Sequence, residues 1–490
     1  MATLEKLRFD NTYSRLPEKF YRRVQPTALP SPYLVSFNEK AAELIGLDAA
    51  EAQKNEFVEY FTGNKLLPGS DPISAIYAGH QFGSFVPQLG DGRAILLGEV
   101  VNEKNERWDI QLKGAGMTPF SRMGDGRAVL RSTIREYLCS EAMHALGIPT
   151  TRSLCITGSD APVYRETVET AAVLTRVAPT HVRFGSFELF YYRGQYDEVR
   201  QLADYVIGEF YAHLSDAENK YLEFLREAIR RTAKLIAQWQ SVGFAHGVMN
   251  TDNMSIVGLT IDYGPFGFLD EFDAGFVCNH SDYVGRYAFN QQPVVALWNL
   301  SRLAQALVPH VEPDDAMAAL GEYEDVFHAE YHRLMCAKLG LTSAAENEET
   351  SALLDELFAV LQQNAVDYTI FFRRLNDFDS AAEARNDNLQ KMFLDPQSFD
   401  RWAENYKAHL KKENSVDAAR RERLSSVNPK YILRNHIAQA AIEKAEKGDY
   451  GAVDELLKVL QNPFAEQKEA ERFAEPPAAG IPKIVVSCSS

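Results

Sequence analysis

The chain of 490 residues is 46% hydrophobic and 24% charged, which is the composition of a globular protein with room for two or three domains. Its formal net charge of −17 argues against general nucleic-acid binding, because such binding requires clustered lysine and arginine. No apolar run approaches about 18 residues and the N-terminus has no signal-peptide core, so we expect a cytoplasmic protein with no membrane partner.

Residues 1–75 are predicted to form an N-terminal extension that packs on the main body. They contain proline-rich segments and one short amphipathic helix at 39–45, with no recognisable catalytic motif. A glycine-punctuated stretch, Tyr-Ala-Gly-His-Gln-Phe-Gly, follows at 77–83 and is typical of a turn. We interpret His80 as a hydrogen-bonded structural histidine rather than a ligand.

Residues 76–180 show the pattern of a small sheet that carries one helix. Strict alternation of apolar and polar residues at 108–113 predicts a strand. An apolar stripe at 132–146, followed by glycine at the C-capping position, predicts the helix. Further strands are predicted at 93–101, 152–157 and 163–177, with a hairpin turn at 102–106.

From residue 181 onwards the pattern becomes mainly helical. Helices are predicted at 224–240, 294–308, 323–339 and 351–361. Residues 441–490 are charged and alanine-rich, and we expect them to form a C-terminal helical tail that ends in Cys-Ser-Ser. The predicted fold class is therefore α+β, with a sheet-containing part at 76–180, a helical part at 181–440 and an extension at each end.

The stretch from His246 to Asn253 resembles the catalytic loop of protein kinases, H-R-D-x-x-x-x-N. In that loop Asp accepts the proton of the substrate hydroxyl and Asn binds a metal ion. Asn253 falls at the expected distance from His246, but the Asp position holds Val248, which accepts no proton. An additional carboxylate, Asp252, lies directly beside Asn253.

Asp262 begins an Asp-Tyr-Gly sequence where kinases have the metal-binding Asp-Phe-Gly. Asn253 and Asp262 therefore offer two hard oxygen ligands nine residues apart, which suits magnesium held together with phosphates better than zinc. Either residue by itself is more often a simple turn residue.

Two copies of Gly-Asp-Gly-Arg-Ala are candidate phosphate contacts, at 90–94 and 124–128. Glycines let backbone N–H groups approach phosphate oxygens, and the second copy precedes a helix N-terminus, which attracts anions. Alone, the first copy is more often a hairpin turn and the second only the turn into the helix.

Lys113 is a candidate for the strand lysine that contacts phosphate in kinases, with Glu136 on the helix as its partner. The alternative is a solvated lysine, and Glu136 also completes a Thr-x-x-Glu capping box with Thr133. Arg176 and Arg183 flank the connection to the helical part, where they either reach a triphosphate or are solvated.

Glycine loop, strand lysine, helix glutamate, loop asparagine and Asp-Tyr-Gly occur in the order of a kinase, which predicts a protein-kinase-like two-lobed fold. With these residues the chain resembles the SelO (YdiU) family of kinase-like proteins over almost its whole length. The matching segments are 77–83, 88–93, 110–116, 121–136, 246–264 and the C-terminal Cys-Ser-Ser.

The resemblance implies a protein adenylyltransferase, which transfers AMP from ATP to Ser, Thr or Tyr hydroxyls of other proteins. It implies that Asp252 accepts the proton, and that Asn253 and Asp262 bind Mg²⁺ or Mn²⁺. It also implies that ATP is reversed relative to kinases, with its α-phosphate toward the acceptor. The residues expected to contact ATP are Gly90, Gly92, Arg93, Lys113, Glu136, Asp125, Gly126, Arg176, Arg183 and Asp262.

A reversed triphosphate needs extra cations for its β- and γ-phosphates, which become the leaving group, and the arginines and lysine above would supply them. Two alternatives stay open. One is a conventional phosphotransferase that uses Asp252 as its base, and the other is a non-catalytic nucleotide-binding pseudokinase. The sequence leaves the use of UTP in place of ATP open as well.

Of the five cysteines, four lie in apolar or mixed surroundings and are expected to be buried thiols. Cys488 is the third residue from the C-terminus, at the position where eukaryotic members of the resembled family carry selenocysteine. We expect a redox partner to react with this accessible thiol, and we hypothesise a regulatory disulfide between Cys488 and Cys278.

Overall fold

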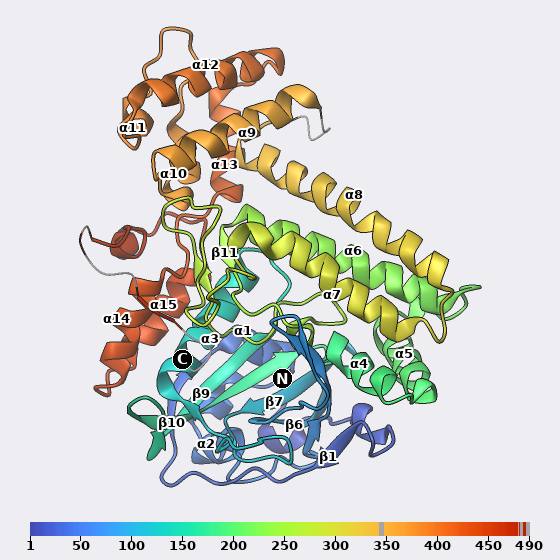
Figure 1. Ribbon diagram of the computed structural model, residues 1–490. Coiled ribbons are helices and arrows are strands. Elements are labelled where there is room, and N and C mark those ends of the chain that lie inside the picture. The colour runs from blue at the N-terminus through green and yellow to red at the C-terminus, as the bar shows by residue number, and fades with distance from the viewer. Residues whose placement is uncertain (343–346, 479, 481–483, 487–490) are drawn as a thin grey trace.

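The computed structural model describes residues 1–342, 347–478, 480 and 484–486. An antiparallel sheet of eight strands lies at one end of the molecule, and long helices occupy the other end (Figure 1). The predicted α+β class is confirmed. In spatial order the sheet contains β1 (Tyr21–Arg23), β3 (Ile73–Ala75), β6 (Ala94–Val101), β7 (Arg107–Lys113), β10 (Val168–Ala178), β9 (Arg152–Tyr164) and β2 (Tyr33–Phe37), while β8 (Ala128–Val129) pairs with β10.

The first 75 residues supply both edges of this sheet. Strands β1 and β3 form one edge, and β2 pairs with β9 at the other. Helices α1 (Glu39–Leu44) and α2 (Asn55–Thr62) share a core with β6 and β7. Residues 1–75 thus complete the main sheet, and the predicted domain boundaries at 75, 180 and 440 stay predictions.

Strands β9 and β10 form a longer hairpin than the sequence predicts. Strand β9 continues to Tyr164, and the chain turns where the N–H of Arg165 donates to the carbonyl of Thr167 at 3.0 Å. Gly158, Asp160 and Pro162 interrupt the apolar pattern beyond residue 157. The ladder accommodates this stretch with a register shift, so regular pairing continues where the sequence indicates a break.

The polar face of β7 is buried rather than solvated. Asp109, Gln111 and Lys113 are 5%, 0% and 9% exposed, respectively. Gln111 accepts a hydrogen bond from Arg176 of β10 at 3.1 Å. The interpretation of Lys113 as a solvated lysine is therefore wrong, because Lys113 is buried and pairs with Glu136.

Helix α3 (Leu130–Ala145) packs against β9 and β10 and corresponds to the predicted helix at 132–146. It begins two residues earlier than predicted, and its N-cap Val129 makes no side-chain capping bond. Glu136 consequently lies in the second turn. The capping-box interpretation of Glu136 is wrong, because a capping glutamate must lie at the third helical position.

The helical end of the molecule is built on long helices that pack side by side, with α6 (Lys220–Ser241) on both α7 (Gln292–Leu307) and α8 (Pro313–Lys338). The predicted helices at 224–240, 294–308, 323–339 and 351–361 are present, and α8 starts ten residues early because Pro313 and two aspartates begin its first turn well. The α-helices of the structure between residues 184 and 363 are α4 (Phe184–Tyr192), α5 (Tyr196–Phe210), α6 (Lys220–Ser241), α7 (Gln292–Leu307), α8 (Pro313–Lys338) and α9 (Glu348–Gln363).

Helix α9 and the helices that follow it form a second core, after which the chain returns to the sheet. The second core includes Leu357, Phe371 and Trp402. Helix α15 (Gly451–Leu460) packs against α3 (Figure 1), while the predicted helical tail over 441–490 stays a prediction. The remaining helices are α10 (Tyr368–Arg374), α11 (Asp387–Gln390), α12 (Pro396–Lys412), α13 (Asp417–Val427), α14 (Asn435–Ala445) and α15 (Gly451–Leu460).

Across the described part of the chain, no helix has both the length and the apolar character needed to cross a membrane. The four cysteines predicted to be buried are buried, namely Cys139, Cys155, Cys278 and Cys336. Cys488 lies outside the described residues, so its disulfide with Cys278 and its reaction with a redox partner remain predictions.

Candidate active site

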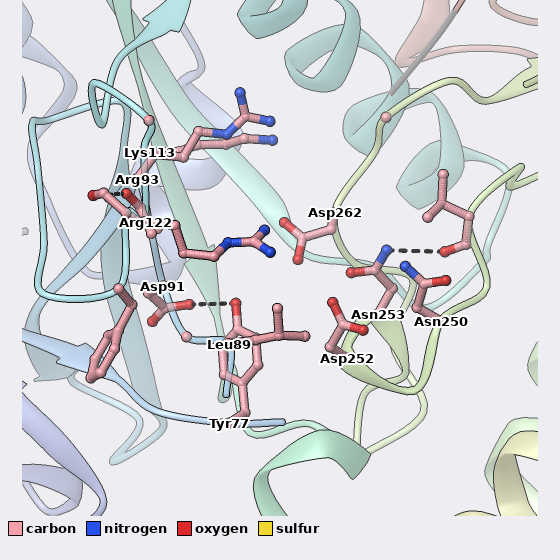
Figure 2. Close-up of a pocket in the computed structure, with 18 of the residues that line it drawn as sticks. Tyr77, Leu89, Asp91, Arg93, Lys113, Arg122, Asn250, Asp252, Asn253 and Asp262 are labelled. Carbon is pink, nitrogen blue, oxygen red and sulfur yellow. Dashed lines mark hydrogen bonds between the residues drawn. The ribbon is translucent and has the colours of Figure 1, made fainter. Parts of the chain in front are cut away.

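A pocket of about 580 Å³ lies between the sheet and the loops that follow α6 (Figure 2). The loop before β6, the end of β7, the loop at 117–127 and β10 line one side. Residues 248–253 and 262–265 line the other side. The segments that carry the sequence motifs therefore meet at one place.

The structure brings the predicted site residues together around this pocket. Glu136 is the exception, since it lies behind the wall and pairs with Lys113. The predicted residues that line the pocket are Gly90, Gly92, Arg93, Lys113, Asp125, Gly126, Arg176, Arg183, Asp252, Asn253 and Asp262.

Four of the cations that line this pocket are those predicted from the sequence, namely Arg93, Lys113, Arg176 and Arg183, and carboxylates hold three of these four. Glu136 forms ion pairs with Lys113 and, at 2.5 Å, with Nε of Arg176. Burial lowers the pKa of Lys113 to about 8 even though Glu136 opposes the shift. Arg93, in contrast, keeps an exposed side chain, and Arg176 and Arg183 are buried. The alternative that both buried arginines are solvated is wrong.

Asp262 is the negative centre of this cation cluster. Its carboxylate pairs with Nη2 of Arg176 at 2.5 Å and with Nη1 of Arg183. Burial disfavours the ionised carboxylate, but Arg183, Arg176 and Lys113 outweigh burial and hold the pKa of Asp262 well below its usual range. Asp262 also has a φ of 56°, a left-handed conformation that is uncommon outside glycine.

Asn253 offers a second oxygen beside Asp262. Its amide nitrogen donates to the carbonyl of Val248 at 3.0 Å, which fixes the side-chain orientation. Figure 2 shows the side-chain oxygen on the side of Asp262. Within the described residues no group of three or more His, Cys, Asp or Glu side chains could hold a metal ion. One carboxylate and one amide fit magnesium, which takes its other ligands from phosphates and water.

Asp252 lies on the same side of the pocket as Asn253 and is only 7% exposed. Burial raises its pKa to about 6, while hydrogen bonding from Gln81 and the charge of Arg183 partly oppose the shift. Nη1 of Arg183 donates to the backbone carbonyl of Asp252 at 2.7 Å. A carboxylate with a pKa near 6 is suited to accept a proton near neutral pH.

Both Gly-Asp-Gly-Arg segments line the same pocket, although the sequence alone favours simple turns. Gly126 has a φ of +69°, and a side chain there would place Cβ 2.1 Å from the backbone carbon of Gly116. Asp125 is exposed and forms an ion pair with Arg165 at 2.8 Å, which lowers its pKa. Gly126 is therefore required where the loop packs closely on the backbone of Gly116 beside the pocket.

Several lining residues were missed by the sequence interpretation. Asp91, between two predicted glycines, is buried, and burial raises its pKa. Arg122 and Asn250 also line the pocket, and no recognisable spacing identifies them. Gln81 belongs to the stretch at 77–83, whose glycines are the only signal that its backbone approaches another segment closely.

A pocket that gathers lysine and arginine side chains together with carboxylate and amide oxygens has the groups that enzymes acting on nucleoside triphosphates use to hold phosphates and a metal ion. The family model described as "Protein adenylyltransferase SelO" matches residues 3–461. The chain belongs to this family of protein nucleotidyltransferases, as its resemblance implies.

Curated relatives named "Protein nucleotidyltransferase YdiU" match along the whole chain. The protein of Thiobacillus denitrificans is 58% identical and that of Myxococcus xanthus 57% identical, each over 100% of both chains. A relative in Pseudomonas aeruginosa strain LESB58 is 50% identical, again over 100% of both chains.

Proposed function

We propose that this protein transfers AMP from ATP to Ser, Thr or Tyr hydroxyls of protein substrates. Family membership supports the reaction class. The observation that carries the proposal is the separation of charges within the pocket. Lys113 and Arg93 lie on the sheet side, Asp252 and Asn253 lie on the opposite side, and Asp262 lies between them (Figure 2).

This separation fits a triphosphate whose α-phosphate lies nearest Asp252. The β- and γ-phosphates then contact Lys113, Arg176 and Arg183, where fixed cations stabilise the charge that develops on the leaving group. The acceptor oxygen bonds to the α-phosphorus, the bond from that phosphorus to the bridging oxygen breaks, and pyrophosphate leaves. Asp252 takes the hydroxyl proton.

Asn253 and Asp262 would hold Mg²⁺ or Mn²⁺ in this arrangement. When bound, the metal ion neutralises phosphate charge. Arg176 and Arg183, which pair with the Asp262 carboxylate in this structure, line the same pocket and would contact phosphate oxygens beside the ion.

The proposal includes the kinase-like two-lobed fold and the cytoplasmic location expected from the sequence. A strand lysine paired to a helix glutamate supports the kinase likeness. UTP as a second donor is also proposed, because the contacts named above are all to phosphate groups, which ATP and UTP share.

The test uses ATP labelled separately at the α- and γ-phosphates, with mixed protein acceptors and either Mg²⁺ or Mn²⁺. We expect only the α-label to enter protein, and we expect the Asp262→Ala variant and metal-free reactions to lose it. Transfer of the γ-label alone would identify a phosphotransferase and overturn the proposed orientation. ATP binding without transfer of either label would instead support the pseudokinase.

A further inference from the structure

The hairpin of β4 (Gly79–Gln81) and β5 (Ser84–Val86) lies directly on the loop that carries Asp252. The backbone N–H of His80 donates to the hydroxyl of Thr251 at 2.7 Å. The N–H of Phe82 donates to the side-chain oxygen of Asn250 at 3.2 Å. Both hydrogen bonds thus connect the hairpin to the two residues immediately before Asp252.

A buried cluster secures this contact. Nδ1 of His80 lies 2.8 Å from Oε1 of Glu188 on α4, and the hydroxyl of Thr251 donates to Oε2 of the same carboxylate at 2.6 Å. His80 is 7% exposed, and Glu188 is fully buried. His80 is therefore a structural histidine, as the sequence interpretation states, and its role is to join hairpin, loop and helix.

The two carboxylate oxygens of Asp252 make different contacts with the hairpin. Oδ1 is shielded from water and has no hydrogen-bond partner among the described residues. It faces Gly79, where an added Cβ would lie only 2.6 Å away. Oδ2 accepts a hydrogen bond from Nε2 of Gln81 at 3.2 Å. Because Asp252 lines the pocket and Oδ1 is shielded, Oδ2 is the oxygen available to a substrate.

We propose that Gln81 is the positioning residue for Asp252, and that Oδ2 is the oxygen that takes the proton from the acceptor hydroxyl. This inference rests on the proposed role of Asp252. A carboxylate oxygen has two lone-pair directions, so Oδ2 holds the Gln81 N–H in one direction and offers the other to the hydroxyl. Gln81 itself transfers no proton, since its carboxamide is a neutral donor.

The contact restricts rotation of the carboxylate about its final torsion angle, which is otherwise broad for aspartate. Small misplacement of a reacting group is costly, because an error of about 1 Å can lower a rate by about a hundredfold. Loss of the Gln81 N–H should therefore slow the chemical step without weakening ATP binding. Gln81 donates to Asp252, whereas the phosphate-side cations lie on the sheet side of the pocket.

The test compares Gln81→Met with wild type and with the control Ser84→Ala, an exposed position on the same hairpin. Methionine keeps the length of the side chain but removes the donor. We expect Gln81→Met to lower kcat by about tenfold or more, measured with α-labelled ATP at saturating acceptor. The Kd for ATP, measured by isothermal titration calorimetry, should stay within twofold of the wild-type value. The Tm should stay within a few degrees of wild type, and Ser84→Ala should behave in the same way in both measurements.

A kcat within twofold of wild type would overturn the positioning role, and so would a parallel loss of ATP affinity. Asp252→Asn separates this failure from failure of the proposed function. If Asp252→Asn keeps the wild-type rate of α-label transfer, Asp252 is not the proton acceptor and the role of Gln81 falls with it, whereas transfer of AMP itself still stands. If Asp252→Asn is slow while Gln81→Met is not, only the role of Gln81 falls.

Discussion

Arg183 and Asp262 form an ion pair at the centre of the pocket, and the same guanidinium nitrogen donates to the backbone carbonyl of Asp252. Arg183 therefore connects the proposed metal ligand with the proposed proton acceptor before any nucleotide binds. Nη2 of Arg183 also lies 3.7 Å from Oδ1 of Asp91, and its Cζ lies 4.8 Å from the centroid of the Tyr77 ring. This arginine should serve both the stability of the empty site and ATP binding.

We predict that Arg183→Met lowers the free energy of unfolding of the nucleotide-free protein by about 3 kcal/mol, because it leaves part of a buried charge network uncompensated. It should also weaken ATP binding. Urea unfolding monitored by circular dichroism measures the first effect, and calorimetric titration with ATP measures the second.

Arg200→Met is a matched control for this substitution. Arg200 pairs with Asp197 on the surface of α5, and exposed ion pairs contribute about 0–1 kcal/mol. A destabilisation by Arg183→Met no larger than that by Arg200→Met would show that the central network contributes no more than a surface pair.

The sequence predicted those parts of the site that depend on local spacing. Asn253 and Asp262 follow a recognisable order of motifs, and both line the pocket. Glu136 was ambiguous, because Thr133-Ile134-Arg135-Glu136 satisfies the capping-box pattern whether or not the helix begins there. Only the start of α3 at Leu130 shows that Glu136 is free of capping and available to pair with Lys113 of β7.

The contacts that the sequence could not predict are those between distant segments. Gln81 and Asp252 are 171 positions apart, and no local pattern records that they meet. Likewise, the alternation along β7 predicts a polar face but does not show whether that face is exposed to water or buried against other polar side chains. Register and burial depend on the tertiary partner, as Lys113 and Gln111 demonstrate.

We predict that Gly79→Ala lowers kcat by about a hundredfold while the protein stays folded. The new methyl group would lie 2.6 Å from Oδ1 and 2.9 Å from Cβ of Asp252, so the side chain must move. Steady-state transfer of α-label measures the effect. Gly208→Ala in α5, where an added Cβ has open space, is the control. Equal rates in both variants would show that Asp252 tolerates displacement.

We predict that kcat falls as the pH is lowered through about 6, which is the value to which burial raises the pKa of Asp252. The ionised carboxylate is the proton acceptor, so the rate should fall about tenfold per pH unit below this value and level off above it. Single-turnover transfer at saturating ATP between pH 5 and 8 measures the profile. A rate independent of pH over this range would contradict proton acceptance by Asp252.

A second pH effect should concern stability rather than catalysis. Glu99 on β6 is 1% exposed, and burial, aided by the neighbouring carboxylate of Asp109, raises its pKa from 4.5 to about 7. A raised pKa in the folded state means that folding favours protonated Glu99. Its contribution is therefore fully present below about pH 4.5 and is lost as the pH rises through about 7.

Glu99→Gln removes this titration. Between pH 4.5 and 8, the wild-type free energy of unfolding should fall by about 3 kcal/mol relative to the variant, since one pKa unit corresponds to about 1.4 kcal/mol. Urea unfolding of both proteins at several pH values gives the difference, and the absolute stability of the variant does not affect it. A difference that stays constant over this range would show that Glu99 ionises equally readily in the folded and unfolded chains.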